Sequence, residues 1–188
     1  MSGIDNRKDI LIILLALPGA SAEPYEPIVG RTRLMKLLFL VERELNVRRR
    51  FSIRDYYSFE PYHYGPFSKD VFDDLDFLRN VGLLASAPGG PASRALQAET
   101  EKLLEEEDVP LESDTNLPTD LEERFELTPK GKRFYEDQLA SSLPSDIRDQ
   151  LISLKQGLGS VSLSSLLRYV YQKYPESAEK SKLSHLVS

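Results

Sequence analysis

The spacing of hydrophobic residues along the chain predicts a mainly helical protein. Over residues 31–45 the apolar side chains recur every three or four positions, as they do on one face of an amphipathic helix. The charged residues of this segment, Arg33 and Lys36 among them, are therefore expected on its polar side. A continuous apolar run predicts a second, buried helix over residues 7–17, which Pro18-Gly19 would end.

The remaining pattern predicts an alternation of short strands and further helices. In chain order we expect an irregular loop (20–29), an extended segment with Pro61 at an edge or interruption (51–64), a helix (69–81), a strand (83–87), a strand (124–127), a helix (128–139) and two helices that begin near residues 145 and 162. The expected helix caps are Asn6 or Asp5, Ser68, Thr128, Ser145 or Asp146, and Ser162.

The apolar segment near the N-terminus has the look of a signal peptide, because small residues follow it. However, Asp5 and Asp9 flank the basic pair Arg7-Lys8, and the apolar run is much shorter than the roughly 20 residues that span a bilayer. We interpret it as a buried first helix. The expected location is therefore cytoplasmic, with no membrane association.

A helix followed by two strands that can pair is the core-plus-wing order of a winged helix. Residues 69–87 and 124–127 supply that order here, and an acidic stretch replaces the tip of the wing. The expected fold is mainly α with a small β-hairpin (α+β). We expect a winged-helix-like domain over residues 1–139 with an acidic insertion at 88–123, and a C-terminal helical extension over 140–188.

Two stretches of this sequence resemble a known family. Residues 34–40 (LMKLLFL) and 59–68 (FEPYHYGPFS) resemble the SocA-like (Panacea) antitoxin and phage-associated family, which shows an LxKLLYF helix and then a Tyr-Gly-Pro turn into a helix. Residues 125–131 (FELTPKG) also resemble the wings of PadR- and MarR-type regulators. The first resemblance covers roughly residues 30–85. It implies toxin neutralisation, regulation or a role in phage defence.

The charge of the chain is unevenly distributed. Residues 96–126 have a net charge of −10, whereas residues 1–95 have +1 and residues 127–188 have +3. The acidic stretch is either a solvated run or a nucleic-acid mimic that competes for a basic surface. Clustered basic side chains near aromatic rings can neutralise phosphates while the rings stack on bases. The nucleic-acid-binding candidates are Arg48, Arg49, Arg50, Arg54, Lys130, Lys132 and Arg133.

The expected helix over residues 69–81 argues against conventional DNA reading. It carries four aspartates against Lys69 and Arg79, so it would repel a phosphate backbone. The turn before it is a structural element in one interpretation, since glycine permits a positive φ and proline fixes the turn. In the other interpretation it is a contact surface, and its partner-binding candidates are Tyr62, Tyr64 and Phe67.

Catalytic chemistry has little support in the sequence. The chain has no cysteine, so thiolate nucleophiles, disulfides and zinc–thiolate sites are excluded. It shows no nucleophile elbow and no phosphate-binding glycine loop, and its two histidines, His63 and His185, lie far apart in the chain. Asp73 and Asp74 would need a third ligand to bind magnesium. We therefore expect no enzymatic activity, no cofactor and no metal.

The sequence favours a non-enzymatic regulatory or antitoxin-like protein that acts by binding. Its expected partner is DNA, or a cognate toxin or other protein, in a toxin–antitoxin or phage-defence setting. The alternative is a pure protein–protein interaction adaptor or oligomerisation module that binds no nucleic acid. A homodimer is compatible with either.

Overall fold

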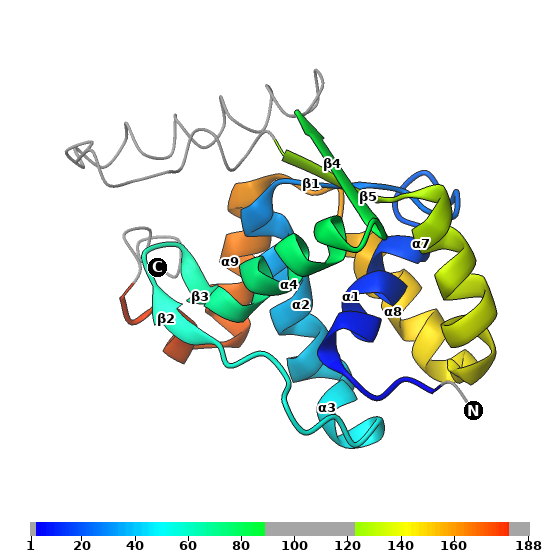
Figure 1. Ribbon diagram of the computed structural model, residues 1–188. Coiled ribbons are helices and arrows are strands. Elements are labelled where there is room, and N and C mark those ends of the chain that lie inside the picture. The colour runs from blue at the N-terminus through cyan, green and yellow to red at the C-terminus, as the bar shows by residue number, and fades with distance from the viewer. Residues whose placement is uncertain (1–2, 89–122, 181–188) are drawn as a thin grey trace.

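The computed structural model describes residues 3–88 and 123–180, which form a mainly helical fold with two small antiparallel sheets (Figure 1). The elements, in chain order, are α1 (Arg7–Ala16), β1 (Ile28–Val29), α2 (Arg31–Leu45), α3 (Val47–Arg50), β2 (Glu60–Tyr62), β3 (Gly65–Phe67), α4 (Lys69–Asn80), β4 (Leu84–Pro88), β5 (Glu123–Leu127), α7 (Pro129–Phe134), the π-helix η1 (Tyr135–Leu139), the 3-10 turn η2 (Ala140–Ser142), α8 (Ser145–Leu158), α9 (Leu163–Lys173) and the 3-10 turn η3 (Pro175–Ala178). The acidic insertion expected over residues 88–123 lies outside the described residues, except for its first and last residue. His185 also lies outside them.

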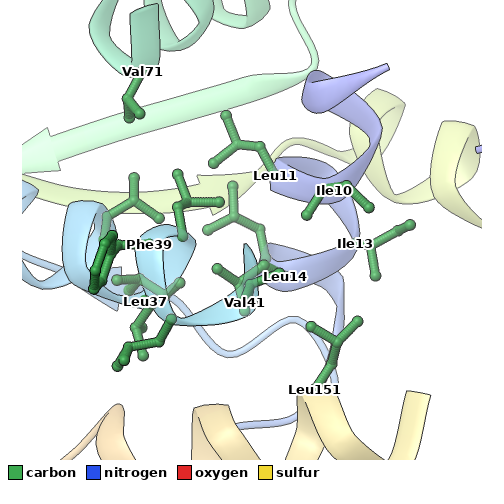
Figure 2. Close-up of a cluster of buried hydrophobic side chains, with 14 of the residues drawn as sticks. Ile10, Leu11, Ile13, Leu14, Leu37, Phe39, Val41, Val71 and Leu151 are labelled. Atoms are coloured by element: carbon green, nitrogen blue, oxygen red, sulfur yellow. The ribbon is translucent and has the colours of Figure 1, made fainter. Parts of the chain in front are cut away.

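Helix α1 lies at the centre of the protein. Every residue from Ile10 to Leu17 is at most 3% exposed, as expected for a helix that is apolar on all sides. Asn6 caps its N-terminus and forms a capping box with Asp9. The sequence offered Asn6 or Asp5 for this cap, and Asn6 is the one confirmed. Figure 2 shows side chains of α1 and α2 gathered in this core, with Val71 of α4 and Leu151 of α8 on opposite sides.

The three-stranded sheet has the order β1-β5-β4, with both pairs antiparallel. The β4–β5 ladder runs from Leu84 opposite Leu127 to Pro88 opposite Glu123, so the two strands predicted to form a hairpin do pair. Strand β1 adds to the other side of β5, where Ile28 lies opposite Phe125. The sequence predicted an irregular loop at β1, so that expectation was wrong for its last two residues.

The C-terminal helices share the core of the N-terminal part. Leu151 of α8 and Leu166 of α9 belong to the same buried cluster as α1 and α2. The spacing of apolar residues after Ser162 predicts that Leu163, Leu166, Leu167, Val170 and Tyr171 form the buried face of α9, and each of them is at most 2% exposed. No helix in the described ranges is long and apolar enough to cross a membrane.

The predicted caps are confirmed at some helices and wrong at others. Thr128 accepts a hydrogen bond from the backbone of Gly131, and Ser162 caps α9 in the same way. Ser68 lies at the N-cap of α4, but its side chain makes no capping hydrogen bond. Helix α8 begins after Pro144 without a side-chain cap, so the caps expected at its start were wrong.

Candidate functional site

The β2–β3 hairpin carries the segment that the sequence singled out. Its strands pair Tyr62 with Gly65, so the turn falls at His63 and Tyr64. Gly65 has a φ of +82°, and a Cβ atom there would lie 2.8 Å from the ring of Tyr171. Both the backbone conformation and the close packing therefore require glycine at this position.

Lys36 fastens this hairpin to helix α2. Its side chain is buried, and its Nζ donates a hydrogen bond to the carbonyl oxygen of Pro66 at 2.9 Å. Burial lowers the pKa of Lys36 to about 7, because the charged form loses its hydration. The expectation that Lys36 lies on a polar face was wrong, since the hairpin covers that side of α2.

An aromatic surface, formed by Tyr62, His63, Phe67 and Phe72, extends from the hairpin onto helix α4. The rings of Tyr62 and His63 are stacked, with centroids 4.4 Å apart and an interplanar angle of 7°. Phe67 lies 5.0 Å from Tyr62 and 5.7 Å from Phe72. Tyr62 is the most exposed ring of this surface, at 48%.

All three partner-binding candidates lie in the β2–β3 hairpin. Tyr62 and Phe67 lie together in the aromatic surface. Tyr64 and Phe67 are both partly buried and packed against the hydrophobic core, and burial raises the pKa of the Tyr64 hydroxyl. Ring contacts join Tyr62 and Phe67 with His63 and Phe72. That any of the three candidates binds a partner stays a prediction.

The carboxylates of helix α4 have two different roles. Asp74 is buried and accepts from Arg7 Nε at 2.7 Å, and Asp70 accepts from Arg7 Nη1 at 2.9 Å. This ion-pair group joins α4 to the start of α1, and the hydrogen bond that Arg7 donates to Asp74 raises the pKa of Arg7. Asp73 and Asp76 are exposed on α4, and the guanidinium of Arg31 lies 5.2 Å from the centre of the Phe72 ring.

The first basic cluster lies on α3 and in the loop that follows it. Arg48, Arg49, Arg50 and Arg54 are all exposed. Arg50 forms an ion pair with Asp146 at the start of α8, which partly neutralises it. Positive charge at the end of a helix is also favoured by the helix dipole, so this cluster has a structural explanation as well as a functional one.

The second basic cluster, on α7, makes contacts within the fold. Lys130 donates to the carbonyl oxygen of Val81 at 2.7 Å, at the end of α4. The Nζ of Lys132 lies 4.8 Å from the centre of the Tyr25 ring in a cation–π contact. Arg133 is exposed. Figure 1 shows α3 and α7 at separate ends of the molecule, so the structure does not bring the two clusters together.

Two further buried cations were missed by sequence reasoning. Arg33 of α2 donates to the carbonyls of Leu158 and Val161 at 2.9 and 2.7 Å, although the sequence placed it on a polar face. Lys155 of α8 donates to the carbonyl oxygen of Leu17 at 2.6 Å and to a second carbonyl in the loop before β1, and burial lowers its pKa to about 8. In sequence both look like ordinary surface charges, and no local signal marks them as buried.

The described residues contain no group of three or more metal-ligating side chains. Comparison with protein families, with curated proteins and with solved structures gives no match. The geometry of the aromatic surface and of the basic cluster on α3 is thus the basis for assigning a function.

Proposed function

We propose that this protein is a non-enzymatic, regulatory or antitoxin-like binding protein that engages a cognate protein through its aromatic surface. The proposal is based on the environment of Tyr62. Its ring is half exposed, is stacked on His63 and contacts the ring of Phe67. Tyrosine rings of this kind are enriched among the residues that dominate binding energy at protein interfaces.

The rigidity of the hairpin supports this role. Lys36 and the close packing at Gly65 fix the hairpin against α2 and α9, so Tyr62 is positioned before a partner arrives. A pre-ordered surface loses less conformational entropy on binding than a flexible one. The exposed Asp73 and Asp76 of α4 would repel phosphates, so we favour a protein partner over nucleic acid.

The arrangement of the N-terminal elements supports a winged-helix-like core. A winged helix contains three helices, a short strand after the first of them, and a hairpin whose returning strand pairs with that short strand. In this chain α1, α2 and α4 would be the three helices, and β1 lies beside β5 in the order β1-β5-β4. The resemblance to SocA-like proteins would place such a protein in a toxin–antitoxin or phage-defence setting in the cytoplasm.

An affinity-capture experiment with two matched variants tests the proposal. Among the residues that the structure describes, Tyr62 and Phe77 are the exposed large hydrophobic ones, at 48% and 49%, and only Tyr62 belongs to the aromatic surface. Tagged wild type, Tyr62→Ala and Phe77→Ala proteins would be expressed in the source cells, cross-linked and compared by quantitative mass spectrometry. We expect at least one protein to be recovered by wild type and Phe77→Ala and lost with Tyr62→Ala. Recovery of the same proteins by all three would contradict the proposal.

A second candidate function is DNA binding through the basic cluster on α3. Arg48, Arg49 and Arg54 are exposed within a short stretch of chain, and such clusters bind phosphates with a strong dependence on salt. Mobility-shift titrations of duplex DNA at low and moderate salt would compare wild type with Arg48→Ala/Arg49→Ala. Arg168→Ala, an exposed arginine on α9, is the matched control. If wild type does not shift duplex DNA at low salt, this candidate is excluded.

A further inference from the structure

The attachment of the β2–β3 hairpin to α2 depends on one buried lysine. Lys36 is 3% exposed, and the carbonyl oxygen of Pro66 is the one hydrogen-bond acceptor that the described residues provide for its Nζ. An ammonium group has three N–H donors. A charged Lys36 in this position therefore has two donors buried without an acceptor, which costs free energy.

No opposite charge offsets this cost. The titratable groups of the hairpin, of the buried side of α9 and of η3 are Glu60, Tyr62, His63, Tyr64, Tyr171 and Glu176. Glu60 is exposed, and Glu176 is exposed and pairs with Arg43. None of these groups contributes to the lowered pKa of Lys36, which burial alone accounts for.

The other two buried cations are better satisfied. Arg33 donates to two carbonyl oxygens. Lys155 also donates to two, and the nearby carboxylate of Glu26 acts to raise its pKa. Of the three, Lys36 thus gains the most from reaching water when it carries a proton.

The hairpin that covers Lys36 buries little apolar surface of its own. Gly65 and Pro66 are its buried residues, and the other six of residues 60–67 are half-buried or exposed. The chain on either side of it is held by Tyr57 and Ser68, both of which are buried. A segment with few buried apolar contacts opens at a lower free-energy cost than the core around it. Opening of the hairpin alone would therefore hydrate Lys36 while the rest of the fold stays intact.

We propose that Lys36 is a pH switch for the β2–β3 hairpin. The neutral amine holds the hairpin on α2 through Pro66, and protonation of the amine favours release of the hairpin into solvent. Because Tyr62 and Phe67 lie on the hairpin, its release would disperse the aromatic surface. This regulation of binding rests on the proposed function, whereas the switch itself does not.

The size of the effect follows from proton linkage. The pKa of Lys36 is about 7 with the hairpin in place, whereas a hydrated lysine titrates at about 10.4. A fall in pH therefore adds protons mainly to the open form. The equilibrium constant for opening should rise about tenfold between pH 8 and pH 6 and level off below pH 6, where both forms carry the proton.

Hydrogen exchange of the hairpin amides in the full chain tests the switch. Protection factors, corrected for the intrinsic effect of pH on exchange, would be measured by mass spectrometry from pH 5 to pH 8 for the hairpin and for α1. The proteins are wild type, Lys36→Met, which has no proton to bind, Lys155→Met, which removes the buried lysine of α8, and His63→Gln, which removes the imidazole of the turn.

In wild type we expect the hairpin to be about tenfold less protected at pH 6 than at pH 8. Its protection should be lower than that of α1 and unchanged by about 0.5 M urea, because local opening exposes little surface. Lys155→Met and His63→Gln should keep the tenfold change, and Lys36→Met should lose it.

The proposal is overturned if the hairpin exchanges only together with α1, or if its protection is the same at pH 8 and pH 6. It is also overturned if the change persists in Lys36→Met or disappears in His63→Gln. Should Lys36→Met not fold, the wild-type profile and His63→Gln still decide. Capture through Tyr62 is carried out at one pH, so the switch and the proposed function fail separately.

Discussion

The buried Lys36 predicts that the protein becomes more stable as the pH rises from 7 to 9. The folded-state pKa of Lys36 is about 7, whereas an exposed lysine in the unfolded chain titrates near 10.4. Between these values the unfolded chain binds the proton and the folded protein does not. Raising the pH through this window therefore removes a proton mainly from the unfolded state, which favours folding.

The magnitude follows from the linkage relation. Over pH 7 to 9 the difference in proton binding at Lys36 amounts to roughly 2 kcal/mol of added stability. Lys155, whose pKa is lowered to about 8, adds about 1 kcal/mol in the same direction. The range ends below pH 10 because burial raises the pKa of Tyr56 and Tyr57 well above their usual value, and tyrosine ionisation in the unfolded chain reverses the trend there.

The assay is urea unfolding followed by circular dichroism at pH 7 and pH 9. The variant Lys36→Met should lose about 2 kcal/mol of the pH-dependent gain, because it has no proton to release at this site. Lys69→Met, at an exposed lysine at the start of α4, is the matched control and should keep the wild-type gain. Stability that stays flat or falls between pH 7 and 9 in wild type would refute the reasoning, as would an unchanged gain in Lys36→Met.

Three further substitutions have expected effects on stability, each measurable by thermal or urea unfolding. Gly131→Ala should lower it by about 3 kcal/mol, because the new Cβ would lie 2.1 Å from the carbonyl oxygen of Leu83; near-wild-type stability would show that this contact relaxes freely. Asp74→Asn should cost about 2 kcal/mol, since the amide leaves Arg7 without its buried carboxylate; the absence of any loss would contradict a structural role for this pair. Gly157→Ala should raise stability by about 0.5–1 kcal/mol, and a loss would mean that the site is less open than the structure indicates.

Local patterns were sufficient for the elements whose causes are local. The cap at Asn6, the three- and four-residue spacing in α9 and the Thr128-Pro129 start of α7 each act within one or two helical turns. The pairing of β4 with β5 was also predictable, since two short strands between helices have few other partners.

The remaining features depend on segments that are distant in sequence. Strand β1 has two residues and exists because β5, some 95 positions later, offers a free edge. Arg33, Lys36 and Lys155 are buried because other segments place carbonyl oxygens over them. The spacing rule for amphipathic helices predicts that charged side chains face the solvent. It therefore predicts these three residues to be exposed, whereas they are buried.

The aromatic surface illustrates the same limit. The segment around Tyr62 was identified from sequence, and Tyr62 and Phe67 do come together. The addition of Phe72 depends on how the hairpin lies against α4, which no spacing rule describes.

The three buried cations have a consequence for how the sequence can change. Arg33, Lys36 and Lys155 each bind backbone carbonyl oxygens, which every amino acid provides. The residues that display side chains on the hairpin can therefore be exchanged without loss of the contact that holds it. Tyr62 and its neighbours could diverge to follow a changing partner while the anchor at Pro66 stays in place, so the scaffold is suited to rapid change in specificity at constant fold.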